Sequence, residues 1–171
     1  VDRIEVLGRD SIVIGTDGKD LHYTSVRLGR NPRVASRFVE ENASQGELRS
    51  HGFFYKPDGP EGGILGLPVR GEGRPGYEHL FKNSASIQFL RNDRLRLTEI
   101  GKLDSKPQRS SDDNCKASCV DWYGNARPLF VKNRVFALLG YEIVEGALDD
   151  GRIREMRRTS FAPSKRLERL D

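Results

Sequence analysis

Short runs of apolar or alternating residues, separated by turn signals, make up most of this 171-residue chain. Some runs, such as 12–14 (IVI) and 135–139 (VFALL), are apolar throughout, which is typical of strands buried on both faces. Asp-Gly and Asn-rich pairs between the runs tolerate the positive φ angles that hairpin turns require. The pattern predicts short strands at residues 3–7, 11–15, 21–28, 52–56, 64–69, 85–90, 94–103, 128–132, 135–139, 142–145 and 152–161.

Residues 31–42 (NPRVASRFVEEN) fit two structures. Asn31 as a cap and Pro32 in the first turn favour a helix, and the apolar residues that follow lie at helical spacing. The same residues can form a strand over 33–38. We expect the strand, because it would complete a four-stranded unit that recurs along the chain.

Three segments, 3–38, 51–103 and 127–161, share one strand pattern although their sequences are not closely similar. Each begins with a strand, a tight turn and a buried strand. A more polar strand follows, and the last strand is charged. Four antiparallel strands, mostly buried at one side of the unit and mostly charged at the other, are typical of a β-propeller blade.

Three stretches carry a resemblance to a known family: 50–69 (SHGFFYKPDGPEGGILGLPV), 84–103 (SASIQFLRNDRLRLTEIGKL) and 126–146 (ARPLFVKNRVFALLGYEIVEG). They resemble consecutive hairpins of the secreted bacterial C-terminal β-propeller proteins, which are distant relatives of the WD-type repeats. The chain departs from that family by an insertion before the third unit. The resemblance implies an exported propeller whose role is binding, and it supplies no catalytic residues.

We therefore expect an all-β chain of antiparallel four-stranded blades in which residues 1–163 form part of a β-propeller. The approximate blades are 1–45, 46–104 and 125–163, with an insertion loop at 105–124 and a C-terminal tail at 164–171. A complete propeller has about 4 to 8 blades, so the remaining blades must come from another fragment or subunit. The chain opens at Val1 and its only methionine is Met156, which predicts a processed chain or a fragment.

The charge balance argues against nucleic acid as a partner. Basic residues number 29 and acidic residues 25, and the two signs alternate along most of the chain, which is typical of a solvated surface. Aromatic residues that could stack on bases are not interleaved with the basic stretch near the C-terminus. No apolar run approaches the roughly 20 residues of a membrane helix, so we expect no membrane span.

The two cysteines, Cys115 and Cys119, lie in the polar insertion. Their number and spacing fit neither a zinc site nor the C-x-x-C redox motif. We expect a disulfide that substitutes for packing in this loop, with two reduced thiols as the alternative. A disulfide would place the chain in an oxidising compartment, in agreement with the secreted, periplasmic or cell-surface location that the resemblance implies.

The histidines, His22, His51 and His79, fall in three separate places without a neighbouring acidic residue at metal-binding spacing. We interpret them as structural or surface residues and predict no catalytic, cofactor-binding or metal-binding residues and no cofactor. His51 is of slightly more interest because it begins a predicted inner strand, and propeller sites gather at the ends of inner strands.

The last predicted strand is strongly basic. Regular alternation would place Arg152, Arg154, Met156 and Arg158 on one face. Charges on an outer strand can simply prevent edge-to-edge aggregation. Alternatively, Arg152, Arg154 and Arg158 form a binding surface for an acidic protein or glycan.

These observations favour a non-catalytic, exported β-propeller module that serves as a protein- or glycan-binding scaffold. The alternative is part of a propeller enzyme whose central-channel site, with or without a metal, is completed by residues outside this chain.

Overall fold

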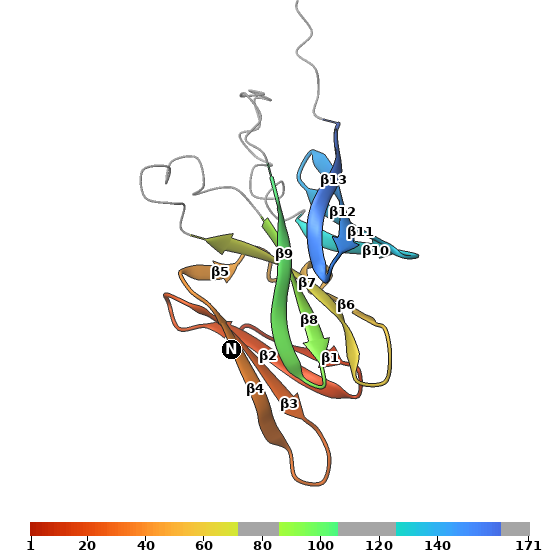
Figure 1. Cartoon of the computed structure of the whole chain (residues 1–171). Helices are drawn as coiled ribbons and strands as arrows, with labels where there is room; N and C mark the ends of the chain where they lie inside the picture. Colours follow the sequence, from red (N-terminus) through yellow and green to blue (C-terminus); the bar gives the residue numbers. More distant parts are fainter. Residues whose placement is uncertain (72–85, 106–125, 162–171) are drawn as a thin grey trace, which may run out of the picture.

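The computed structural model describes residues 1–71, 86–105 and 126–161, and almost all of their regular structure is β-strand (Figure 1). A single short 3₁₀ helix, η1 (Ser50–Gly52), interrupts the strands in these ranges. The strands are β1 (Arg3–Leu7), β2 (Asp10–Thr16), β3 (Leu21–Arg27), β4 (Arg33–Glu40), β5 (Ala43–Gln45), β6 (Phe54–Pro57), β7 (Gly62–Gly71), β8 (Ser86–Asp93), β9 (Arg96–Asp104), β10 (Arg127–Val131), β11 (Arg134–Leu139), β12 (Glu142–Asp149) and β13 (Arg152–Ser160).

The strands form three antiparallel sheets in chain order. The first sheet is β1-β2-β3-β4 and the third is β10-β11-β12-β13, each a simple meander. In the second sheet, β5 and β6 pair with different parts of the same edge of β7, and β8 and β9 follow. The prediction of an all-β chain built from antiparallel four-stranded sheets is confirmed.

The structure settles two details of the predicted boundaries. In residues 31–42 it contains the expected strand rather than a helix, and this strand, β4, extends from Arg33 to Glu40. Residues 43–45, which the first approximate unit included, form the unpredicted strand β5, which pairs with β7 in the second sheet. Most of the predicted insertion (105–124) and all of the predicted tail (164–171) lie outside the described residues.

Each sheet contains one register shift, and it always lies between the last two strands. In the first sheet it falls between Ser25 and Val26, in the second between Phe89 and Leu90, and in the third between Glu145 and Gly146. A β-bulge of this kind adds one residue to a strand and locally increases its twist. The three sheets therefore share the position of their bulge.

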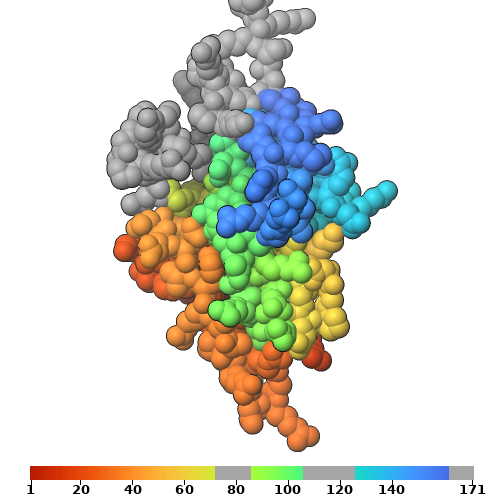
Figure 2. Space-filling model, viewed as in Figure 1, coloured from red at the N-terminus to blue at the C-terminus, as the bar shows by residue number. Residues whose placement is uncertain are grey.

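The second sheet lies between the first and the third (Figure 2), and buried side chains pack it against both. One core joins the first and second sheets and contains Ile12, Tyr23, Leu65 and Leu67. Another joins the second and third sheets through Ile87, Phe89 and their neighbours. This arrangement explains why β7 reads as a continuous apolar run rather than an alternating one.

A polar network also crosses from the first sheet to the second. The fully buried Tyr23 hydroxyl donates to Gln88 Oε1 at 2.7 Å, and burial raises the pKa of Tyr23 well above its ordinary value. Gln88 Nε2 donates in turn to Glu40 and Glu99, at 2.6 and 2.7 Å. Lys102 Nζ completes the network at 2.5 Å from Glu40. Because each buried polar group has a partner, the network favours one register between the two sheets.

Candidate functional site

The predicted binding surface on β13 is only partly formed. Met156 has no partner on β12, because Glu155 pairs with Gly146 and Arg157 with Glu145. This bulge reverses the alternation, so Arg158 lies on the opposite face of the third sheet from Arg152 and Arg154. The prediction that Arg152, Arg154 and Arg158 share one face is therefore wrong.

Arg158 faces the second sheet and is mostly buried, with a side chain that is 14% exposed. Its guanidinium donates to the carboxylates of Glu142 and Glu155 and, at 2.8 Å, to the Asp104 carbonyl oxygen on β9. Burial opposes the charge of Arg158, but the two carboxylates raise its pKa above the ordinary value. Arg158 thus ties β13 to β12 and β9 rather than contacting a partner.

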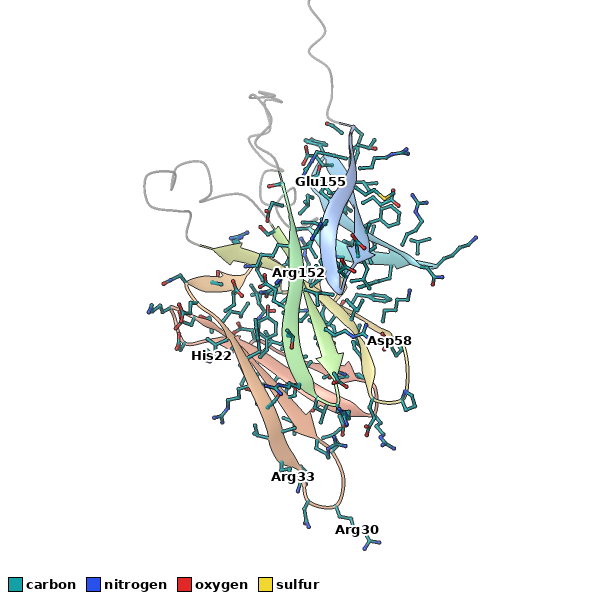
Figure 3. All side chains as sticks on the ribbon, in the orientation of Figure 1. His22, Arg30, Arg33, Asp58, Arg152 and Glu155 are labelled. Atoms are coloured by element: carbon teal, nitrogen blue, oxygen red, sulfur yellow. The ribbon has the colours of Figure 1, made fainter. Side chains whose placement is uncertain are left out.

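The exposed arginines of β13, Arg152, Arg154 and Arg157, lie on the outward face of the third sheet, and we call them the arginine face. Figure 3 labels Arg152 at the start of β13. On the same side of the sheet, Arg134 pairs with Glu145 at 2.7 Å and lies over the Phe136 ring. No ion pair involves an arginine of the arginine face within the part of the chain that the structure describes.

A second candidate is a small crevice where turns of the first and second sheets meet. It is lined by residues of the β1–β2 turn, the end of β3, the β6–β7 turn and the β8–β9 turn: Leu7, Arg9, Asp10, Arg27, Tyr55, Pro60, Glu61, Asn92, Arg94 and Leu95. Three arginines and two acidic residues therefore line one small crevice. Its free space is about that of one water molecule.

Hydrogen bonds fix the side chains at the floor of the crevice. The Tyr55 hydroxyl donates to the Gly62 carbonyl oxygen at 2.8 Å and accepts from Asn92 Nδ2 at 3.0 Å. Asn92 Oδ1 in turn accepts from the Leu95 backbone N–H at 2.9 Å. Burial raises the pKa of Tyr55. The hydroxyl is therefore a neutral, fixed group at ordinary pH.

The charged rim is held less tightly. Glu61 Oε1 lies 3.5 Å from Arg9 Nη2 and 4.0 Å from Arg27 Nη1. Arg27 is also 3.8 Å from Asp10, whose other carboxylate oxygen accepts from the Leu28 backbone N–H at 2.9 Å. This site was not predicted, because its charged residues come from three turns and the end of β3, which are far apart in the sequence. The one available signal was that arginines occur in or beside those turns.

A third cluster surrounds His51, which lies in η1 rather than at the start of a strand as expected. His51 Nε2 is 3.5 Å from the buried carboxylate of Glu47, and Arg49 forms a two-point ion pair with that carboxylate. Burial opposes ionisation of Glu47, but the hydrogen bonds from Arg49 hold its pKa below the ordinary value. Arg3, whose pKa burial lowers, donates to the carbonyl oxygens of Glu47 and Arg49.

This third cluster ties β1 to the loop before β6, which is a structural role. His22 is likewise engaged locally, since its Nε2 lies 2.9 Å from Asp17 Oδ2 in the β2–β3 turn. Three backbone and side-chain hydrogen bonds, from Asp20, His22 and Lys19, lower the pKa of Asp17. His79, Cys115 and Cys119 lie outside the described residues, so the disulfide stays a prediction.

Within residues 1–71, 86–105 and 126–161, no three His, Cys, Asp or Glu side chains gather closely enough to hold a metal ion. The same ranges contain no helix of the length and apolarity needed to span a membrane. The chain matches no protein-family model, no curated protein and no solved structure. The candidate sites must therefore be judged on their own chemistry.

Proposed function

We propose that this chain is part of a β-propeller that serves as a non-catalytic scaffold for binding an acidic protein or glycan. The observation that carries the proposal is the stack of three antiparallel sheets, two of four strands and one of five, each with its register shift between the last two strands. Such repeated units bury their faces against one another and leave turns and edges free for recognition. The remaining blades are supplied by another fragment or subunit.

The arginine face is the surface that we propose for the acidic partner. Its three arginines are exposed and lie on one side of the third sheet. Arginine suits this role because its planar guanidinium binds carboxylate and sulfate-like groups at two points. The exported location rests on the family resemblance and on the pair of cysteines.

The proposal is tested by interferometry on the protein as its gene encodes it, against immobilised heparin and immobilised poly-glutamate. Replacing Arg152 and Arg154 by Gln should weaken binding to at least one of these polymers by about tenfold, since two charge-assisted contacts are lost. The matched control is Arg37→Gln, which removes an exposed arginine of the first sheet.

Equal losses in the double variant and in the control would show diffuse charge attraction and would contradict a defined surface. Absence of binding to both polymers would do the same. The two polymers also distinguish the sources of acidity, because heparin presents sulfates on a glycan and poly-glutamate presents carboxylates on a peptide.

A further inference from the structure

In the crevice between the first and second sheets, long contacts hold a carboxylate of the chain itself, that of Glu61. Glu61 is 42% exposed on its side chain, and its oxygen lies 3.5 and 4.0 Å from the guanidinium groups of Arg9 and Arg27. Charge-assisted hydrogen bonds between such groups are normally about 2.7–2.9 Å long. The arginines are therefore placed for a carboxylate that they do not hold closely.

The backbone that carries Glu61 is fixed, so only its side chain is free to move. The Glu61 carbonyl oxygen accepts from the Arg94 N–H at 2.8 Å, and Gly62 closes the turn by accepting from the Asp58 N–H at 3.1 Å. Departure of the Glu61 side chain would thus leave the turn in place. It would also leave Arg9 and Arg27 beside a single lining carboxylate, Asp10, since the Arg94 guanidinium pairs with Asp93 at 3.4 Å.

Unlike the side chain of Glu61, the side chain of Asp10 is not free to turn out to solvent. Its side chain is 10% exposed, and it accepts a hydrogen bond from the Leu28 backbone N–H. It therefore remains as a negative charge beside Arg27. A dianionic phosphate would meet this charge at close range, whereas a singly charged carboxylate would face less repulsion.

We propose that this crevice binds a carboxylate of an acidic peptide segment of a partner protein, and that Glu61 occupies its place in the free protein. The incoming carboxylate accepts hydrogen bonds from Arg9 and Arg27, and the Glu61 side chain turns outward to solvent. The site lies on turns of the first two sheets and is separate from the arginine face of the third. This second site goes beyond the proposed scaffold function, because its ligand is a carboxylate and the chain's own Glu61 competes with that ligand.

The test measures fluorescence anisotropy of a labelled hexaglutamate peptide with the protein as its gene encodes it. Glu61→Gln should tighten binding by about fivefold, since it removes a competing ion pair worth about 1 kcal/mol. The matched control is Glu41→Gln, an exposed acidic residue of the same charge in the turn after β4. It should change binding less than about twofold, because it alters only the overall charge.

Arg27→Gln should abolish most of the gain seen in Glu61→Gln, and Arg27→Lys should retain part of it because the charge remains. Arginine Nε–Hε signals of Arg9 and Arg27 should shift on titration with the peptide. Thermal unfolding of each variant separates loss of binding from loss of folding. In Arg152→Gln with Arg154→Gln, the peptide should still shift the Arg9 and Arg27 signals as in the unmodified protein, so the crevice and the arginine face can fail independently.

Equal effects of Glu61→Gln and Glu41→Gln would overturn the proposal, as would weaker binding in Glu61→Gln. Failure of hexaglutamate to bind either the unmodified protein or Glu61→Gln at millimolar concentration would overturn it as well. Inorganic phosphate and acetate are tested as competitors. Displacement of the peptide by phosphate at lower concentration than by acetate would overturn the assignment to a carboxylate.

Discussion

The arginines of β13 differ in role although they are close neighbours in the sequence. Arg154 is exposed on the outward face of the third sheet, and Arg158 is held between β12 and β9. The side chain of Glu142, which forms an ion pair with Arg158, is only 7% exposed. A buried carboxylate without its cation is costly, whereas an exposed arginine contributes little to stability.

We therefore expect Arg158→Gln to destabilise the fold by about 1–3 kcal/mol, because it removes the cation that bonds the buried Glu142 carboxylate and the Asp104 carbonyl oxygen. Arg154→Gln makes the same chemical change on the same strand and should stay within about 0.5 kcal/mol of the unmodified protein. Denaturant unfolding, followed by circular dichroism, provides both values. Similar effects of the two variants would mean that Arg158 is not locked as the structure indicates.

At the scale of the elements, the close approach of β7 to β10 depends on a glycine. A Cβ atom added at Gly66 would lie 2.5 Å from Pro128 Cβ and 3.1 Å from the Phe89 ring. The aromatic residues around this contact, Phe89, Phe130 and Phe54, pack at ring-centroid distances of 5.5 and 6.1 Å. The second and third sheets therefore have no space for a side chain at this position.

Gly66→Ala should push β10 away from β7 and cost about 1–3 kcal/mol of stability, as overpacked cores do. Gly59→Ala is the matched control, because a Cβ atom there meets no other atom within 4 Å. Thermal unfolding of both variants checks the prediction. If Gly66→Ala has the same melting temperature as the unmodified protein, the second and third sheets are not packed as closely as described.

At the scale of the whole molecule, the first sheet has an apolar face that no described residue covers. Ile4, Val6, Val34 and Val39 are 67, 68, 50 and 42% exposed, and strand pairing places them on the side away from the second sheet. Half-buried Val13 and Val26 lie between them. A contiguous exposed patch of this kind normally marks an interface or an aggregation liability.

We predict that Val1–Asp171 expressed alone does not behave as a soluble, cooperatively melting monomer. In a stack of repeated sheets each face is buried by its neighbour, and here the outward face of the first sheet lacks one. Light scattering gives the association state, and circular dichroism with heating gives the cooperativity. A well-behaved monomer would refute the partial-ring interpretation and the partner that it requires.

Much of the architecture follows from the sequence because strand signals are local. Alternation, buried apolar runs and Asn or Gly turns predicted most of the strands and their grouping into three sheets. The strand over 33–38 was correctly preferred to a helix because it completes a four-stranded unit, and in the structure the Phe38 ring lies 5.6 Å from that of Tyr23. Strand β5 was not predicted, because three residues carry too little pattern.

The candidate sites were less predictable, for two physical reasons. A β-bulge adds one residue, and every side chain beyond it changes face, so alternation put Arg158 beside Arg152 when the fold separates them. The crevice, in turn, joins Arg9 to Glu61, which lie in different sheets. No local sequence pattern predicts such a long-range contact.

The sequence by itself therefore determined the all-β class, the antiparallel four-stranded units and their order, because these depend on residues near one another in the chain. The tertiary structure alone decided which arginines are exposed, which carboxylates they meet, and which sheet face remains open. Those properties depend on the register between strands and on the stacking of whole sheets. They are set by packing over long sequence separations, where a shift of one residue reverses the outcome.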